Sequence, residues 1–250
     1  DEIEAALAAN IKCFNVESEA ELHHIAEIAT RLGTTAPISL RVNPDVDPKT
    51  HPYISTGLKE SKFGIPMDQA LQLYRTAQTL TGIAIKGIDC HIGSQITQLA
   101  PYLDALDKMF ELIDQLADQG IALEHFDIGG GMGVRYEQEP DFPLQALSDA
   151  LQQKMADRDL RVILEPGRYI IANAGVLLTE VLYTKHNATR AFAVVDAAMN
   201  DLIRPALYDA VQAVHPVVEQ FNPSGRFEIV GPICEAGDFL AKHCLIDLEQ

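Results

Sequence analysis

Short apolar runs rich in branched side chains alternate with segments of helical period, and this alternation restricts the possible folds more than any other feature of the sequence. We expect strands at Ile11–Val16, Ile38–Asn43, Ile83–His91, Leu123–Ile128 and Val162–Leu164. Between the strands, apolar residues recur at helical spacing, as in Leu22, Ile25 and Ile28. A repeat of this kind predicts an α/β fold, in which helices cover a parallel sheet.

Two architectures fit this repeat, a doubly wound sheet and a closed (β/α)8 barrel. Chemically distinctive side chains follow the ends of the predicted strands: His91 ends the third, Gly129–Gly131 follow the fourth and Glu165 follows the fifth. The active site of a TIM-type barrel is assembled at that rim. We therefore predict a (β/α)8 barrel whose first strands, about three, are missing upstream of Asp1.

The pattern changes after Ala172. Strands are predicted at Val176–Tyr183, Ala191–Val195 and Phe227–Val230, with no helix between the first two and with prolines interrupting the rest. We predict two domains. Residues 1–172 form the partial barrel, and residues 173–250 form a β-rich domain whose C-terminal part is missing.

Composition excludes several classes of partner. A net charge of −17 repels a nucleic-acid backbone, and no apolar run approaches the roughly 20 residues that span a bilayer. The cysteines, Cys13, Cys90, Cys234 and Cys244, show neither a C-x-x-C pair nor the spacing of zinc ligands. We expect no metal site, reduced thiols and a cytoplasmic protein that acts on a small molecule.

The run from Phe126 to Gly133 leads from a strand into consecutive glycines. Without a Cβ, this backbone can approach an anion closely and direct N–H groups at it, which suits a phosphate. A dinucleotide fingerprint is excluded because Val134 stands where the third glycine would be and residues 137–143 cannot begin a helix. A tight turn that binds nothing remains the alternative.

Two more clusters lie at predicted strand ends. In Glu165-Pro166-Gly167-Arg168, the carboxylate could stabilise a cationic ring nitrogen and the guanidinium could bind a carboxylate or phosphate. In His91-Ile92-Gly93-Ser94, a flat ring stands near a hydroxyl group. A simple ion pair at the barrel rim and a structural histidine are the alternatives.

The β-rich region contains two further candidates. Arg204 and Tyr208 are four residues apart, on one side of a helical turn, and could bind one carboxylate together, unless they merely belong to a surface helix. Cys234 and Glu235 place a thiol beside a carboxylate in a loop opened by Gly231-Pro232. A buried structural thiol is the alternative for Cys234.

Seven stretches together resemble the diaminopimelate decarboxylases, which are pyridoxal-phosphate (PLP) enzymes of alanine racemase-like fold. The stretches are FNVESEAEL, RVNPDVDPKTHPYISTGLKESKFGI, HIGSQI, FDIGGGMGVRY, EPGRYIIANAG, DLIRPALYDA and GPICEAGD. They span nearly the whole chain in the order of the family.

The resemblance implies how the cofactor is held. Its contacts would be His91, Ser94, Gly129, Gly130, Gly131, Glu165, Gly167 and Arg168. The glycines and Ser94 would hold the phosphate, His91 would stack on the pyridine ring, and Glu165 would keep the ring nitrogen protonated.

The resemblance also implies the substrate. Arg168, Arg204 and Tyr208 would bind the carboxylate at the non-reacting end of meso-2,6-diaminopimelate, and Glu235 would bind its ammonium group. An ornithine-type substrate has no distal carboxylate and would leave the guanidiniums unpaired. The implied products are L-lysine and CO2, in the last step of lysine biosynthesis.

Finally, the resemblance implies a homodimer with shared active sites, in which Cys234 reaches the partner's cofactor and protonates the α-carbon. The family's Schiff-base lysine has no counterpart here, because none of the lysines has its Tyr-Ala-x-Lys-Ala setting. We expect that lysine upstream and expect this chain alone to be inactive. An ornithine, lysine or arginine decarboxylase and a non-catalytic PLP-binding homologue are the alternatives.

Overall fold

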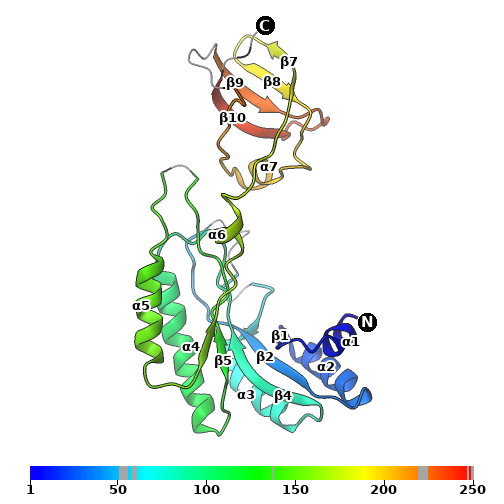
Figure 1. Ribbon diagram of the computed structural model, residues 1–250, viewed down its shortest axis with the longest axis vertical. Helices are drawn as coiled ribbons and strands as arrows, with labels where there is room; N and C mark the ends of the chain where they lie inside the picture. Colours follow the sequence, from blue (N-terminus) through cyan, green and yellow to red (C-terminus); the bar gives the residue numbers. More distant parts are fainter. Residues whose placement is uncertain (51–55, 58–60, 137, 219–224, 247, 249–250) are drawn as a thin grey trace. The chain divides into compact units, whose positions relative to one another are not determined.

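A computed structural model describes residues 1–50, 56–57, 61–136, 138–218, 225–246 and 248. The chain divides into two compact units (Figure 1). The first consists of Asp1–Val134 and Pro140–Ala172, and the second of Arg135–Glu139 and Asn173–Gln250.

The first unit is built on a parallel sheet. Its strands are β1 (Phe14–Val16), β2 (Ala36–Asn43), β3 (Ile65–Pro66), β4 (Ile83–Asp89), β5 (His125–Asp127) and β6 (Arg161–Ile163). Their order is β1-β2-β4-β5-β6, with β3 paired to β2, and every pair is parallel. The spatial order follows the chain without the reversal that defines a doubly wound sheet. The sheet is therefore part of a barrel, as predicted.

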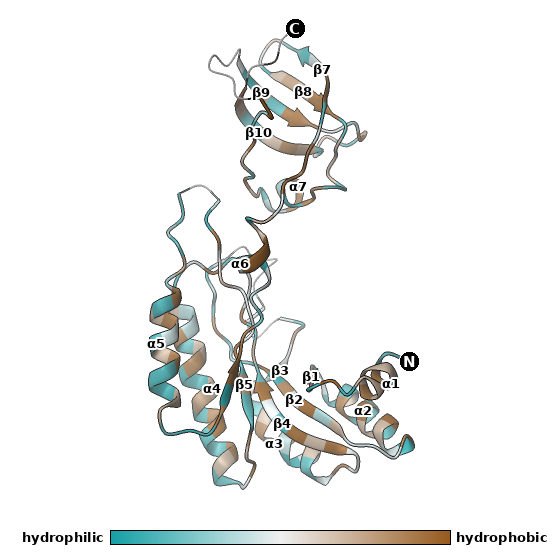
Figure 2. Ribbon diagram, in the orientation of Figure 1, coloured by the Kyte–Doolittle hydropathy of each residue, from teal (hydrophilic) through white to brown (hydrophobic). Residues whose placement is uncertain are grey.

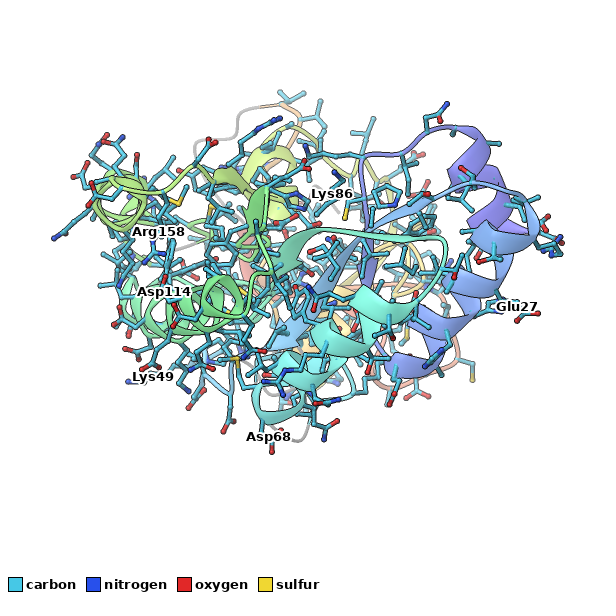
Figure 3. All side chains as sticks on the ribbon, turned by 90° about the horizontal axis from the view of Figure 1, so that it is seen from below. Glu27, Lys49, Asp68, Lys86, Asp114 and Arg158 are labelled. Atoms are coloured by element: carbon cyan, nitrogen blue, oxygen red, sulfur yellow. The ribbon has the colours of Figure 1, made fainter. Side chains whose placement is uncertain are left out.

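Helices cover one face of this sheet. The helices of this unit are α1 (Glu2–Ala8), α2 (Glu19–Arg31), α3 (Met67–Thr79), α4 (Ala100–Asp118), α5 (Leu144–Met155) and the short α6 (Gly167–Ile171). Of these, α2 to α5 cover the sheet, while α6 follows the carboxyl end of β6 (Figure 1). Right-handed crossovers between successive neighbouring strands place α2 to α5 on the same side. Figure 3 shows these helices along the outer side of the curved strands. In Figure 2, apolar residues predominate along β2, whereas the helices carry both polar and apolar residues. Among the described residues, no helix is both long and apolar enough to cross a membrane.

The strand register shows which residues face the helices. Leu40, Ile88 and Phe126 are aligned across β2, β4 and β5, and Phe126 packs edge to face on Phe110 of α4, with ring centroids 5.5 Å apart. The next row in register must face the opposite way, because side chains alternate along a strand. That row consists of Arg41, Asp89 and Asp127, so the inner face of the partial barrel is polar near the strand ends.

One strand differs from its prediction in burial. The apolar run Val162–Leu164 looks like a buried strand, but β6 is the last strand of the sheet and Leu164 is 41% exposed. The strand prediction also extended too far at Ile11, because pairing with β2 begins only at Phe14.

In its described residues, the second unit is a four-stranded sheet with one short helix. Its elements are β7 (Val181–His186), β8 (Ala191–Val195), α7 (Arg204–Tyr208), β9 (Gly225–Val230) and β10 (Phe239–Ile246). The order is β10-β9-β8-β7, with β8 and β9 parallel and the other pairs antiparallel. A small core that includes Val195, Ile229 and Leu240 holds the unit together. The predicted β-rich character is confirmed.

Candidate active site

The glycine run lies where three loops meet at the carboxyl ends of β4, β5 and β6. Gly131 has φ +93°, and a Cβ there would lie 2.1 Å from the carbonyl oxygen of Gly93. A Cβ on Gly130 would lie 2.1 Å from the carbonyl oxygen of Glu165. Side chains cannot be accommodated at such distances, so the backbones of the three loops touch only because these positions are glycine.

The amides of this loop are not equally available. Gly129 N donates to Asp127 Oδ1 at 2.9 Å, and Gly130 N donates to Nδ1 of His91 at 3.1 Å. The amide of Gly131 has no acceptor within the described part of the chain. The Gly131 amide could therefore donate to a bound anion, while the amides of Gly129 and Gly130 fix the shape of the loop.

His91 is held in one protonation state. Because its Nδ1 accepts from Gly130, the proton of the neutral ring is on Nε2. Burial, and then the charge of Arg41, lower the pKa of His91 to about 4. The ring is therefore neutral and uncharged at physiological pH, which suits stacking on an aromatic ring rather than binding an anion.

Ser94 and Arg168 meet beside the glycine loop. The Nη2 of Arg168, in α6, donates at 3.1 Å to the Oγ of Ser94, in the loop after β4. This bond leaves the hydroxyl hydrogen of Ser94 able to donate to another group. A hydroxyl, a guanidinium and a free amide are the donor types that phosphate requires.

A row of charged side chains at the strand ends includes Asp89, an acid that the sequence reasoning missed. Arg41 is paired with Glu17 at 2.6 Å, and Asp89 is 3% exposed with an Oδ1 that has no hydrogen-bond partner among the described residues. Burial, and then the charges of Asp127 and Glu165, raise the pKa of Asp89 to about 8. An acid between Ile88 and Cys90 in an apolar strand was the available signal.

Glu165 and Asp127 belong to the same acidic cluster. Partial burial and the charge of Asp127 raise the pKa of Glu165, and burial raises that of Asp127 against the hydrogen bond from Gly129. Carboxylates whose pKa values are raised in this way stabilise a cation placed among them. A protonated ring nitrogen near Glu165 fits that environment.

Tyr102 supports the loop from α4 and was also missed. Its hydroxyl donates to the carbonyl oxygen of Gly130 at 2.7 Å, and the side chain is 2% exposed. No local sequence signal connects a tyrosine near a helix N-terminus with a glycine run 28 residues later.

The remaining candidates lie in the second unit. The guanidinium of Arg204 lies over the ring of Tyr208, 5.0 Å from its centroid, so both are on the same side of α7 as expected. Cys234 is exposed, which excludes a buried structural thiol. Glu235 accepts from the amide of Gly237 at 3.2 Å.

Asp238 shapes the loop that carries Cys234. It is 3% exposed, and its carboxylate accepts from the amides of Met199 and Ile233 at 2.7 and 2.9 Å. These bonds connect the Cys234 loop to the turn that precedes α7 within the same unit. The sequence reasoning assigned no role to this acid.

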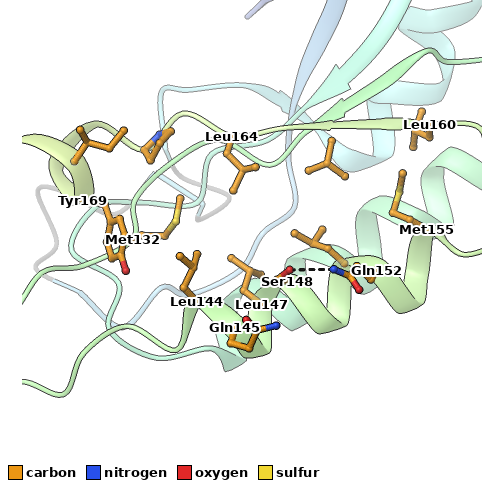
Figure 4. A pocket seen from close by; sticks show the side chains of 14 residues that line it. Met132, Leu144, Gln145, Leu147, Ser148, Gln152, Met155, Leu160, Leu164 and Tyr169 are labelled. Atoms are coloured by element: carbon orange, nitrogen blue, oxygen red, sulfur yellow. Dashed lines mark hydrogen bonds between the residues drawn. The ribbon is translucent and has the colours of Figure 1, made fainter.

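A large apolar cavity lies elsewhere in the first unit. It measures about 890 Å³ and runs between α5 and the exposed edge of β6. Figure 4 shows the side chains of Leu144, Leu147 and Leu164 lining it. It includes neither the glycines of the loop nor Ser94 and Arg168, so we do not assign it to the polar site.

Residues 1–172 match the family model of the pyridoxal-binding domain of pyridoxal-dependent decarboxylases. The chain belongs to this family. The polar site at the glycine run is therefore the place to seek the pyridoxal phosphate of a pyridoxal-dependent decarboxylase, and the free Gly131 amide, the Ser94–Arg168 pair and the acidic cluster fit that cofactor.

Two curated relatives of the chain carry the same name. The chain is 54% identical to the diaminopimelate decarboxylase of Pseudomonas aeruginosa over 97% of its own length and 58% of the relative's. It is 53% identical to the Vibrio cholerae enzyme of the same name, over 96% and 58%. The chain thus spans less than two thirds of the curated relatives that it matches.

Solved structures of amino-acid decarboxylases superpose on nearly the whole chain. The diaminopimelate decarboxylase of Helicobacter pylori, complexed with L-lysine, superposes with a TM-score of 0.93 at 43% identity, covering 99% of this chain and 62% of that one. A lysine decarboxylase from Selenomonas ruminantium superposes with a TM-score of 0.82 at 26% identity, covering 99% and 62%.

Proposed function

We propose that the protein containing this chain decarboxylates meso-2,6-diaminopimelate to L-lysine and CO2 with pyridoxal phosphate, as the last step of lysine biosynthesis. The observation that carries the proposal is the identity of 53–54% to curated diaminopimelate decarboxylases over nearly the whole chain. The lysine decarboxylase structure supports a basic amino-acid substrate less strongly, at 26% identity. Residues 1–172 would form the cofactor-binding part of the barrel and residues 173–250 the β-rich domain.

The phosphate would be held by three donor groups at these loops. These are the Gly131 amide, the Ser94 hydroxyl and the guanidinium of Arg168, which already touches Ser94. Gly129 and Gly130 would contribute shape, since their amides serve Asp127 and His91. Gly167, the first residue of α6, would complete the cofactor contacts next to Arg168.

Pyridoxal phosphate, when bound, supplies an electron sink for the pair that remains on the α-carbon as CO2 departs. His91, neutral and fixed by Gly130, would cover one face of the pyridine ring without adding charge. Glu165 would accept a hydrogen bond from the protonated ring nitrogen and hold that proton in place, supported by the acidic residues around it.

The second unit would provide substrate recognition. Arg204 and Tyr208, stacked on one side of α7, would bind the distal carboxylate together with Arg168. Glu235 would bind the distal ammonium group. A substrate with both groups at its far end satisfies all of these residues, whereas ornithine leaves the guanidiniums unpaired.

The exposed thiol of Cys234 would deliver a proton to the α-carbon of the substrate in the partner subunit of a homodimer. Its exposure and its place in a loop fixed by Asp238 support this role. All four cysteines are free, which supports a cytoplasmic protein.

A mixing experiment with the intact protein tests the shared site. One variant, Gly131→Arg, blocks the phosphate loop, and the other, Cys234→Ala, removes the proton donor. Mixed and re-equilibrated, the two inactive proteins should recover roughly a quarter of wild-type turnover, because half of the dimers are mixed and each has one complete site. Gly120→Arg, on an exposed turn, is the control that should stay active without mixing. No recovery on mixing would contradict the shared site.

A further inference from the structure

Gln95, the residue directly after Ser94, has a strained backbone conformation. Its φ is 58°, in the left-handed region that favours glycine. Residues with a Cβ enter this region at a cost in conformational free energy, and such strain persists only where surrounding contacts hold it. The contacts of Gln95 must therefore hold this conformation.

The carboxamide of Gln95 binds both backbone groups of one residue in the glycine loop. Its Nε2 donates to the carbonyl oxygen of Val134 at 2.6 Å, and its Oε1 accepts from the amide of Val134 at 3.2 Å. A neighbouring strand would satisfy Val134 in the same two ways. The side chain thus acts as a strand partner supplied by a loop.

These two bonds extend a short backbone bridge. Ile96 N donates to Gly131 O and Gly133 N donates to Ile96 O, both at 2.9 Å, which pairs Ile96 with Met132. The side-chain carboxamide of Gln95 adds its two bonds to Val134 next to this bridge. The loop of His91 to Ile96 is joined in this way to the loop of Gly129 to Val134.

The bonds between these two loops set the distance between two donors for an anion, the Ser94 hydroxyl and the Gly131 amide. Ser94 stands one residue before Gln95, and the Gly131 amide stands one residue before Met132 in the bridge. The backbones are already as close as glycine permits, with the carbonyl oxygen of Gly93 against Gly131. Loss of the Gln95 bonds would let the loops separate and move the Ser94 hydroxyl away from the Gly131 amide.

We propose that Gln95 is a positioning residue whose carboxamide closes the two phosphate-binding loops on each other, and so sets the affinity for the phosphate of the cofactor. The inference rests on the proposed use of these loops to bind pyridoxal phosphate. Gln95 touches no reacting atom in this account and acts only through Ser94 and Gly131. Glutamate cannot replace it, since a carboxylate accepts from Val134 N but cannot donate to Val134 O.

The test compares pyridoxal phosphate with pyridoxal, which lacks the phosphate, in the intact protein. In Gln95→Leu, the Kd for pyridoxal phosphate, from absorbance titration, should rise at least tenfold, while the Kd for pyridoxal should change less than threefold. Turnover at saturating cofactor should stay within a few fold of wild type. Gln95→Glu should resemble Gln95→Leu.

Gln95→Gly separates the bonds from the strain. Glycine removes the cost of the left-handed conformation and should fold at least as stably as Gln95→Leu, yet bind pyridoxal phosphate as weakly. The matched control is Gln119→Leu, which removes a glutamine that accepts from Arg75 Nε at 2.6 Å far from the loops. It should leave both affinities unchanged.

Two outcomes would overturn the inference alone: a Gln95→Gly protein that binds pyridoxal phosphate within twofold of wild type, or equal losses for pyridoxal phosphate and pyridoxal. A wild-type protein that does not bind pyridoxal phosphate would instead overturn the proposed function on which the inference rests.

Discussion

The backbone amide of Gly130 donates to Nδ1 of His91 across 3.1 Å, joining the loop after β5 to the loop after β4. This bond fixes the tautomer of the imidazole and turns its Nε2–H away from the glycine run. A histidinium would carry a proton on Nδ1 and would confront the amide with a second donor. The geometry and the burial of the ring therefore favour the neutral form for the same reason.

His91 should consequently titrate far below an ordinary histidine. In the ligand-free intact protein with ring-labelled histidine, the NMR signal of His91, identified by its absence in His91→Asn, should show a midpoint near pH 4. Because the unfolded state binds this proton near pH 6.5, stability should fall as pH decreases from about 6.5 to 4. That part of the loss should be absent in His91→Asn. A midpoint at pH 6 or above would contradict this assignment.

Asp89 should show the opposite dependence. Its pKa of about 8 in the folded state lies above the ordinary value of 3.8, so the folded state keeps a proton that the unfolded state releases. Stability is therefore lost as pH rises from about 4 to 8. Asp89→Asn cannot ionise and should raise Tm relative to wild type more at pH 8 than at pH 5.

Thermal unfolding at the two pH values measures this difference. The exposed Asp118→Asn on α4 is the control and should give the same Tm difference at both. An Asp89→Asn effect that is equal at both values, or larger at pH 5, would show that Asp89 is ionised in the folded protein.

Gly131 and Gly120 allow strain and steric overlap to be separated. Both have positive φ, of +93° and +77°, but a Cβ on Gly120 has no heavy atom within 4 Å, whereas one on Gly131 meets the Gly93 carbonyl. Gly120→Ala should cost about 1–2 kcal/mol of unfolding free energy and leave cofactor affinity unchanged. Gly131→Ala should weaken pyridoxal phosphate at least tenfold in a binding titration. Equal behaviour of the two variants would remove Gly131 from the phosphate site.

The alternation of strands and helices was sufficient to predict the barrel-type sheet, because period and turn chemistry are local properties. Predictions were less accurate where the pairing of strands determines where a strand begins and ends. The run Val176–Tyr183 is apolar except at Thr179 and Glu180, yet β7 begins only at Val181, where pairing with β8 starts. The sequence indicated a strand-like segment shortly before Gln250, but it did not give the bounds of β10. The pairing of this strand with β9 is irregular between Ala241 and Cys244, where His243 has φ 58°.

The residues of the candidate site also fall into those that the sequence predicted and those that it did not. Residues with unusual chemistry at strand ends, such as His91 and Glu165, were visible in the sequence. Those that hold them were not: Tyr102 reaches Gly130 across 28 positions and Gln95 reaches Val134 across 39. Such contacts exist only after the loops are folded together. Residues 51–55 and 58–60, within the long stretch that supported the resemblance, lie outside the described residues.

The most direct test of the central claim is a product analysis of the intact protein with pyridoxal phosphate and meso-2,6-diaminopimelate. The account predicts L-lysine and CO2 in equal amounts, and far lower kcat/KM for L-ornithine, L-lysine and L-arginine under the same conditions. Release of CO2 from ornithine or lysine at a kcat/KM equal to or above that for diaminopimelate, or no CO2 from any of the four, would contradict it.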